Sequence, residues 1–354
     1  MKPALKGLGI VVALMVIVVG ALMTVFYARS GAGVDRGPEQ VTACTAIDGQ
    51  GKSGEDILID RERQLALVSW LDRRGGVAGP PTFGTVGRVD LTAAAPKIEP
   101  ALVADPPEFR PHGMSLFVAP EGARVLFVIS HPPGKPHRVE IFEANADGRY
   151  EHKQTVEDPL LIRPNDIQAV GPRQFYIAND SGATNGLGRM REMVFGAALA
   201  QITYYDGAKF SVAAAGLAAP GGINASADLS TIYVAETQGQ RVSIWAREPA
   251  SGTLSPKGQI DLPSLPDNID VAEDGALWVT AHADAIALVR QFADATKEAP
   301  TQVFRVPAQS TTATQVFFST GDVISAGSVA ATLGDKMLLG SITDKKVMLC
   351  EKPM

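Results

Sequence analysis

Oxygen-bearing side chains recur at one place in the sequence, ahead of successive short apolar runs that are typical of β-strands. Seven of them lie nine to twelve residues before the centre of such a run: Glu55, Asp56, Asn165, Asp166, Asn224, Asp267 and Asn268. Carboxylate and amide oxygens, with no cysteine and no histidine at metal-ligand spacing, favour calcium over zinc or copper. Four carboxylates gathered in one narrow place would repel one another and would be costly to bury without a cation. The pattern therefore predicts calcium binding.

The seven side chains divide between two predicted ions, because Asp56 and Asp166 are expected to point away from the residues that precede them, Glu55 and Asn165. One ion, with a catalytic role, is predicted to bind the larger group: Glu55, Asn165, Asn224, Asp267 and Asn268. Its double charge would face only two carboxylates, so it would remain a useful Lewis acid. Asp56 and Asp166 are predicted to hold a second, structural ion at greater depth. The alternative is that the Asn and Asp pairs only cap turns, and the common offset of the whole set argues against it.

Two histidines stand where a proton-transfer group is needed. His112 occupies the equivalent position in the second repeat, and His131 ends the strand that follows. Because imidazole titrates near neutral pH, His112 is predicted to act as general base with His131 as its relay. His137 and His152 lie in polar, turn-like stretches and are predicted to be structural, and His282 is intermediate. No G-x-S-x-G, zincin, Walker or EF-hand motif is present, so a serine nucleophile has no support.

These side chains can meet only if the elements that carry them repeat around a common axis. Six short β-rich runs follow turn signals along the chain: LALVSW, VLFVIS, FYIAN, TIYVAE, ALWVTA and MLLGS. Their centres lie 45 to 60 residues apart, the period expected of four-stranded propeller blades. Equivalent positions of different blades would meet at one end of a central channel. The sequence thus predicts an all-β, six-bladed β-propeller over residues 41–354.

The two ends of the chain carry further predictions. Residues 8–27 contain no charge and are long enough to cross a membrane as a helix, with residues 1–7 in the cytoplasm and residues 28–40 as a linker. A cleaved signal peptide is the alternative, although its apolar region would be shorter. In either case the propeller would face the periplasm or the cell exterior, where Cys44 and Cys350 are expected to form a disulfide. That bridge would hold the first blade against the last.

The charge and composition indicate what the partner is. The 354-residue chain has a formal net charge of −6 and no basic cluster interleaved with aromatic residues, so nucleic acid is not an expected partner. The expected partner is a small-molecule substrate. One stretch departs from the strand pattern, because GRMREMVFGAALAQ from Gly188 has helical apolar spacing. We expect it to pack on the propeller rather than to lie on a membrane surface.

The chain resembles the serum paraoxonase/arylesterase family in both cysteines and in six collinear segments: GEDILI, RPHGMSLF, PNDIQAVGPRQFYIAND, GGINASADLSTIYVAE, DNIDVAEDGALWVTAH and GSVAATLGDKMLLGSI. The resemblance implies a six-bladed propeller with two calcium ions in its channel and a disulfide that joins its ends. It assigns both ions the ligands given above and adds the backbone carbonyl of Met114 to the structural ion. It also implies a dyad of His112 and His131, and hydrolysis of lactones and aryl esters by a base-activated water at a calcium-polarised carbonyl.

Two loops depart from the pattern of that family. SGATNG follows Asn179 and Asp180, where the family usually places aromatic and histidine residues around its pocket, and residues 238–240 contain no histidine. These differences leave the predicted calcium ligands intact and the substrate open. One alternative is a gluconolactonase-type sugar-lactone hydrolase, against which the Glu55–Asp56 pair and the terminal cysteines argue. The other is a membrane-anchored propeller that binds a partner protein without catalysis, in which His112 would be freely replaceable.

Overall fold

The six β-rich runs become the second strands of six four-stranded antiparallel sheets. The structure, a computed structural model, describes residues 2–353, and the side chains of all of these except residues 2–12, 77 and 78. The innermost strand of each sheet contacts the innermost strands of both neighbouring sheets, so the sheets form a closed ring. The predicted all-β, six-bladed β-propeller is confirmed.

Each of the first three blades uses four consecutive strands, from the centre of the ring outward. The first blade contains β2 (Ser53–Asp60), β3 (Leu65–Leu71), β4 (Thr85–Asp90) and β5 (Ile98–Pro100). The second contains β6 (Pro111–Val118), β7 (Arg124–Ser130), β8 (Arg138–Ala144) and β9 (Tyr150–Glu157). The third contains β10 (Pro164–Ala169), β11 (Phe175–Asn179), β12 (Ala200–Tyr205) and β13 (Phe210–Leu217).

The next two blades repeat this order, and the last blade combines both ends of the chain. The fourth contains β14 (Pro220–Ala225), β15 (Thr231–Glu236), β16 (Arg241–Arg247) and β17 (Leu254–Asp261). The fifth contains β18 (Leu265–Val271), β19 (Leu277–His282), β20 (Thr301–Val306) and β21 (Thr314–Ser319). The sixth contains β22 (Gly327–Leu333), β23 (Lys336–Ser341), β24 (Lys346–Glu351) and, outermost, β1 (Cys44–Asp48).

The N-terminal strand closes the ring by completing the sixth blade. Cys44 faces Cys350 in the antiparallel register of β1 and β24, and the two form the predicted disulfide. The bridge therefore lies between the two outer strands of one blade. Our expectation that it would join the first blade to the last was wrong, because β1 pairs with β24 instead of with a strand of the first blade.

Buried apolar side chains fill the space between neighbouring sheets. One such cluster joins Tyr176 and Ile202 of the third blade to Ile223 and Ile232 of the fourth. Another joins Ile57 of the first blade to side chains of the sixth. Because every blade covers an apolar face of the next, the innermost strands are held in fixed positions around the axis.

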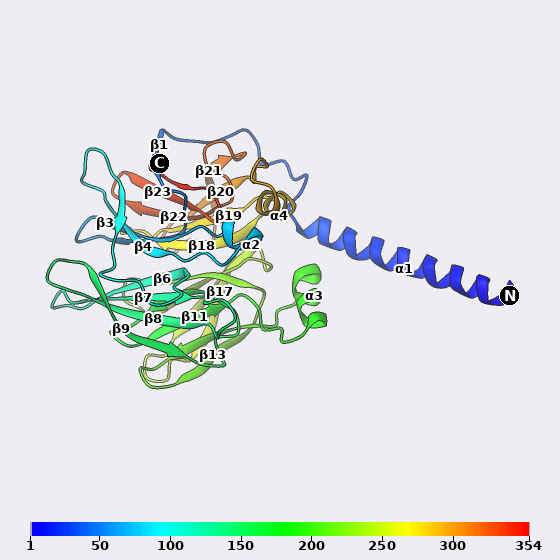
Figure 1. The fold of residues 1–354 in the computed structure, drawn as a ribbon, viewed down its shortest axis with the longest axis horizontal. Coiled ribbons are helices and arrows are strands. Elements are labelled where there is room, and N and C mark those ends of the chain that lie inside the picture. The colour runs from blue at the N-terminus through cyan, green and yellow to red at the C-terminus, as the bar shows by residue number, and fades with distance from the viewer. Residues whose placement is uncertain (1, 354) are drawn as a thin grey trace.

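The described part of the chain contains four helices beside the propeller: α1 (Lys2–Arg29), α2 (Gly75–Ala78), α3 (Gly186–Phe195) and α4 (Ala285–Ala293). Figure 1 shows α1 projecting away from the ring, and the other three lie on the side from which it leaves. In the part of the chain whose side chains the structure describes, which begins within α1 at residue 13, no helix is long and apolar enough to cross a membrane. The span expected at residues 8–27 is therefore not supported, and its first five residues lie outside that part. The helix expected from Gly188 is present as α3, and the amide oxygen of Asn185 caps it by accepting from the Gly188 N–H.

Candidate active site in the central channel

Each innermost strand carries a register irregularity near its start. The six shifts fall between Gly54 and Ile57, Pro111 and Met114, Pro164 and Asp166, Pro220 and Ile223, Pro266 and Ile269, and Gly327 and Val329. A β-bulge interrupts the regular alternation and redirects side chains. Six predicted site residues lie inside these irregularities: Glu55, Asp56, His112, Asn165, Asp267 and Asn268. The bulges therefore place them at equivalent points of different blades.

Asp56 and Asp166 form a buried pair that backbone amides contact. The Met114 N–H donates to Asp56 over 2.6 Å, and the Ile223 N–H donates to Asp166 over 2.8 Å. Burial raises the pKa of Asp56 well above its ordinary value, and the charge of Glu55 adds to the rise. Burial and the charge of Asp56 likewise raise the pKa of Asp166. The two carboxyls predicted for the structural ion are thus close enough to interact.

Glycine at position 113 permits this approach of the second and third blades. A Cβ atom there would stand 2.5 Å from the Asn165 carbonyl oxygen and 2.5 Å from the Asp166 Cα. No real side chain tolerates such contacts with backbone atoms, so the two inner strands can pack this closely only around a glycine.

Glu55 contacts several side chains at the predicted site of the catalytic ion. Its Oε2 atom is 3.3 Å from His112 Nε2 and 3.7 Å from the Arg73 guanidinium, and its Oε1 atom accepts from the Asn268 amide over 3.4 Å. Burial acts to raise the pKa of Glu55, but the charges and hydrogen bonds of His112, Arg73 and Asn268 outweigh it and lower the pKa to about 2. Glu55 is therefore held as a carboxylate.

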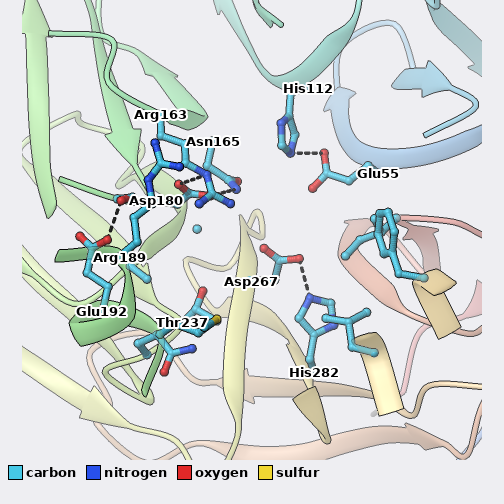
Figure 2. A pocket seen from close by; sticks show the side chains of 18 of the residues that line it. Glu55, His112, Arg163, Asn165, Asp180, Arg189, Glu192, Thr237, Asp267 and His282 are labelled. Carbon is cyan, nitrogen blue, oxygen red and sulfur yellow. Dashed lines mark hydrogen bonds and ion pairs between the residues drawn. The ribbon is translucent and has the colours of Figure 1, made fainter. Parts of the chain in front are cut away.

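Asn165 and Asp267 face the same space from the third and fifth blades (Figure 2). The Asn165 Oδ1 atom is buried and meets no hydrogen-bond donor among the described residues. Asp267 is 3.0 Å from His282 Nε2. These buried oxygens face a common space and lack enough hydrogen-bond donors. Oxygen atoms in such a place suit a hard cation as ligands.

Asn224 differs from the other predicted ligands. It lies beyond the bulge of β14, in regular pairing with Tyr233. Its amide nitrogen donates to the Ile269 carbonyl over 2.8 Å, and its Oδ1 atom accepts from the Ala225 N–H. The structure thus connects Asn224 to the strand that carries Asn268, and no hydrogen bond joins Asn224 to Glu55 in the described part of the chain.

The calcium ions themselves are not confirmed by the geometry. Within the described part of the chain, no group of three or more His, Cys, Asp or Glu side chains is arranged to hold a metal ion. The predicted ligand sets depend on amide and backbone oxygens in addition to carboxylates, and the carbonyl role of Met114 stays a prediction.

The two predicted catalytic histidines are joined by a hydrogen bond. His112 Nδ1 lies 2.8 Å from His131 Nε2. Burial lowers the pKa of His131 well below its ordinary value, and the nearby His112, His137 and Arg73 lower it further. A neutral His131 can hold His112 in one ring orientation, as a base and its partner require.

A cavity of about 800 Å³ opens above these residues. Glu55, His112, Asn165 and Asp267 form its floor, and its outer walls include apolar side chains of α3 and α4: Met190, Met193, Leu288 and Phe292. Figure 2 shows Arg163, Asp180 and Arg189 on one side of the same cavity, where Arg163 pairs with Asp180 over 2.9 Å. The site therefore combines a polar floor with a partly apolar entrance.

Sequence reasoning missed several residues of this site. Arg73 follows the second strand of the first blade and reaches Glu55, while His282 ends β19 and reaches Asp267. Asp180 lines the cavity directly after β11. A shared signal existed, because all three residues lie at or just after the C-terminal end of the second strand of a blade. That end is next to the bulge in the first strand of the same blade. An offset counted downstream of each strand centre would have found them.

One known protein family matches most of the chain. The model of the family described as Arylesterase matches residues 78–352. Human serum paraoxonase/arylesterase 1 is 30% identical over 325 residues, which cover 89% of this chain and 90% of that protein. Human serum paraoxonase/lactonase 3 is 27% identical over 94% of this chain and 95% of that protein.

Solved structures match the fold at lower identity. The gluconolactonase XC5397 from Xanthomonas campestris aligns with a TM-score of 0.55 and 14% identity, over 90% of this chain and 96% of that one. A luciferin-regenerating enzyme aligns with a TM-score of 0.54 and 14% identity, over 88% and 96% of the two chains. At such identities these two likenesses show the fold alone.

Proposed function

The chain belongs to the arylesterase family, and from this membership and the geometry of the channel we propose that it hydrolyses lactones or esters in a calcium-dependent reaction. One observation carries the proposal. Residues from four blades, redirected by bulges, meet on the floor of one cavity beside a hydrogen-bonded histidine pair. A propeller that served only as a scaffold would have no need of buried carboxylates and a histidine pair in one cavity.

The residues on the floor suit the proposed ions. Glu55, Asn165, Asp267 and Asn268, together with Asn224, would hold the catalytic calcium, while Asp56, Asp166 and the Met114 carbonyl would hold the structural one. A calcium ion bound by the first set would polarise the carbonyl of the substrate and stabilise the oxyanion. The buried Asn165 oxygen without a donor and the carboxylate state of Glu55 support this assignment.

His112 and His131 would supply the base. In its neutral form His112 can present Nε2 to a water molecule in the cavity and take the proton that the water loses as it attacks the carbonyl. The hydrogen bond from Nδ1 to His131 fixes the ring plane for this step. The proton then passes to the leaving oxygen of the opened lactone or ester.

The entrance favours substrates with an apolar part. Met190, Met193, Leu288 and Phe292 line it from two helices, and such side chains gain free energy by burying hydrocarbon rather than hydroxyl groups. We therefore propose lactones with an alkyl side chain, or aryl esters, as the substrate class.

An oxidising compartment outside the cytoplasm is the proposed location of the propeller. The Cys44–Cys350 disulfide supports it, because such bonds form and persist mainly in exported proteins.

The test is an assay of the purified full-length protein on δ-lactones of increasing alkyl length, on phenyl acetate and on gluconolactone, each with calcium and with excess chelator. We expect hydrolysis only with calcium, and a kcat/KM that rises with alkyl length because each buried CH₂ contributes about 0.8 kcal/mol. Preference for gluconolactone over every alkyl lactone would refute the substrate class. No hydrolysis of any substrate would refute the function.

A further inference from the structure

Three imidazoles, not two, are hydrogen-bonded in a row beside the cavity. His131 Nε2 contacts His112 Nδ1 at 2.8 Å, and His131 Nδ1 contacts His137 Nδ1, also at 2.8 Å. The rings meet edge to face, with interplanar angles of 73° and 88°. His112 lines the cavity, whereas His137 lies half-buried in the loop before β8. The row thus leads from the floor of the cavity toward the surface of the protein.

The hairpin of the second blade explains why His137 reaches its neighbour. Ser130 and Arg138 form the last pair in the antiparallel register of β7 and β8. His131 and His137 are the next residues outward on the two strands, so the connecting loop returns the second ring to the first. The Pro- and Gly-containing segment between them, PPGKP, makes this return. Sequence reasoning treated His137 as structural because it considered the turn and not the register.

Each of the two contacts between rings holds one proton, and this restricts the neutral row to two arrangements. In the first, His112 carries its proton on Nδ1, His131 on Nδ1 and His137 on Nε2, so every ring donates outward and His112 Nε2 is free to act as a base. In the second, His112 and His131 carry their protons on Nε2 and His137 on Nδ1, so every ring donates inward and His112 can act as an acid.

Resting on the proposed hydrolysis, we propose that His137 is the outer member of a three-histidine proton relay that converts His112 from a base into an acid within one turnover. When His112 Nε2 takes a proton from the attacking water, the Nδ1 proton of His112 moves to His131 Nε2. The Nδ1 proton of His131 moves to His137 Nδ1, and the Nε2 proton of His137 leaves to solvent. One proton enters the row, one leaves it, and the row is left in the second arrangement.

The return path has the same balance. His112 Nε2 donates its proton to the oxygen that leaves when the acyl–oxygen bond breaks, and His137 Nε2 takes one proton from solvent. The protons between the rings move inward, and the first arrangement is restored. Without the third ring, His131 Nδ1 would have no group to exchange with, and the pair could not change direction by this path.

The surroundings favour uncharged rings at His131 and His137, the two members of the row behind His112. Burial lowers the pKa of His131, and so do His112, His137, Arg73 and Arg110. Burial also lowers the pKa of His137, with Arg163 and His112 adding to it. A permanently charged ring in the row would hold protons on both of its nitrogens and would block transfer.

Two variants separate a relay from mere positioning of His131. His137→Gln keeps an amide that can share a hydrogen bond with His131 Nδ1 but cannot pass a proton, whereas His137→Ala removes the partner and opens space for added imidazole. The full-length protein is assayed for lactone kcat with each variant, with and without imidazole, and each melting temperature checks the fold. We expect kcat to fall about 10-fold or more in both, and imidazole to restore part of it in His137→Ala only.

Full kcat in His137→Gln, or no recovery of a folded His137→Ala with imidazole, would overturn the relay. A second readout does not depend on activity. In ¹⁵N-histidine-labelled protein, the shared N–H proton between His131 and His137 should give a resolved low-field resonance that His137→Ala removes. Persistence of that resonance in His137→Ala would refute the three-ring arrangement itself. If the wild type hydrolyses nothing while the resonance behaves as expected, the proposed function fails and the arrangement stands.

Discussion

His112 and Glu55, which both line the cavity, are in contact at 3.3 Å. A carboxylate so close to an imidazole either accepts a hydrogen bond from the ring N–H or binds a cation instead. The His131 partner on the other ring nitrogen leaves Nε2 as the atom that faces the cavity. His112 is therefore placed to exchange protons with whatever occupies the cavity, and Glu55 is placed to bind a cation beside it.

Replacing His112 tests this role most simply. We expect His112→Gln to lower lactone turnover by about 100-fold or more, because general base catalysis typically contributes that much. The calcium content of the purified variant should equal that of the wild type, since the imidazole is not among the proposed ligands. His152→Gln is the matched control, because His152 lies on the outer strand β9 and pairs with Glu140 instead of lining the cavity. Wild-type turnover in His112→Gln would contradict the role of His112 as base and favour a mechanism that depends on the metal alone.

The depressed pKa of His131 predicts a loss of stability in mild acid. The unfolded chain binds a proton at this residue near the ordinary histidine value of 6.5, whereas the folded protein binds it only at lower pH. Between those values the unfolded state holds more protons, so the free energy of unfolding falls as the pH decreases below about 6.5. Thermal melts from pH 7 to pH 5 with constant excess calcium should show this fall, and it should be smaller in His131→Gln. An equal slope in both proteins would exclude His131 as its source.

The sequence predicted which residue types form the site better than it predicted the contacts between them. Glu55, Asn165, Asp267 and Asn268 were predictable because a narrow range of offsets from the strand centres selects them. Arg73 and His137 were not, since their roles depend on the reach of a long side chain from the loop after β3 to β2 and on the register of one hairpin. Periodicity fixes where a backbone position lies, whereas the reach of a long side chain depends on packing in three dimensions.

At the level of elements, the bulge of each innermost strand is the feature that assembles the site. The strands themselves were predictable from their apolar runs and their spacing. The bulges were not, because an extra residue leaves the local composition unchanged. The sequence places Gly or Pro at the start of all six irregularities, and that shared feature is the one signal that could have indicated them.

Close packing between neighbouring bulges gives a prediction of its own. A Cβ atom on Gly222 would stand 2.5 Å from the Asp267 carbonyl oxygen and 2.7 Å from the Asn268 Cα. Gly222→Ala should therefore separate β14 from β18, destabilise the protein by about 1–3 kcal/mol and lower activity by displacing both predicted ligands. Gly258→Ala on the exposed strand β17 is the control, since a Cβ there meets nothing within 4 Å. Equal melting temperatures and activities for the two variants would contradict this packing.

At the scale of the whole molecule, the ring is closed by β1 and by the disulfide that joins it to β24. The six blades, their order and the cysteine pair followed from the sequence alone, because repeats and paired cysteines are properties of the whole chain. The blade that β1 would join did not follow. Choosing between the first and the sixth blade depends on which strand edge is free, and the sequence does not show that edge.

Reduction of the disulfide should lower the melting temperature of the full-length protein. The bridge closes 306 residues, for which the chain-entropy model gives up to about 5 kcal/mol. We expect less, because the backbone pairing of β1 with β24 remains after reduction. The Cys44→Ser, Cys350→Ser double variant should match the reduced wild type and should not respond to reductant. An unchanged melting temperature on reduction, with both thiols then open to alkylation, would show that the strand pairing alone closes the ring.

Removal of calcium from the purified full-length protein tests the proposed site most directly. Without ions, Glu55, Asp56, Asp166 and Asp267 would share one channel with too little positive charge. An ion present at about a thousand times its Kd stabilises a fold by about 4 kcal/mol. Excess chelator should therefore abolish lactone hydrolysis and lower the melting temperature together. Calcium should restore both, and magnesium should do so poorly because it requires tighter octahedral coordination. A metal-free protein with full hydrolytic activity and an unchanged melting temperature would contradict the calcium site.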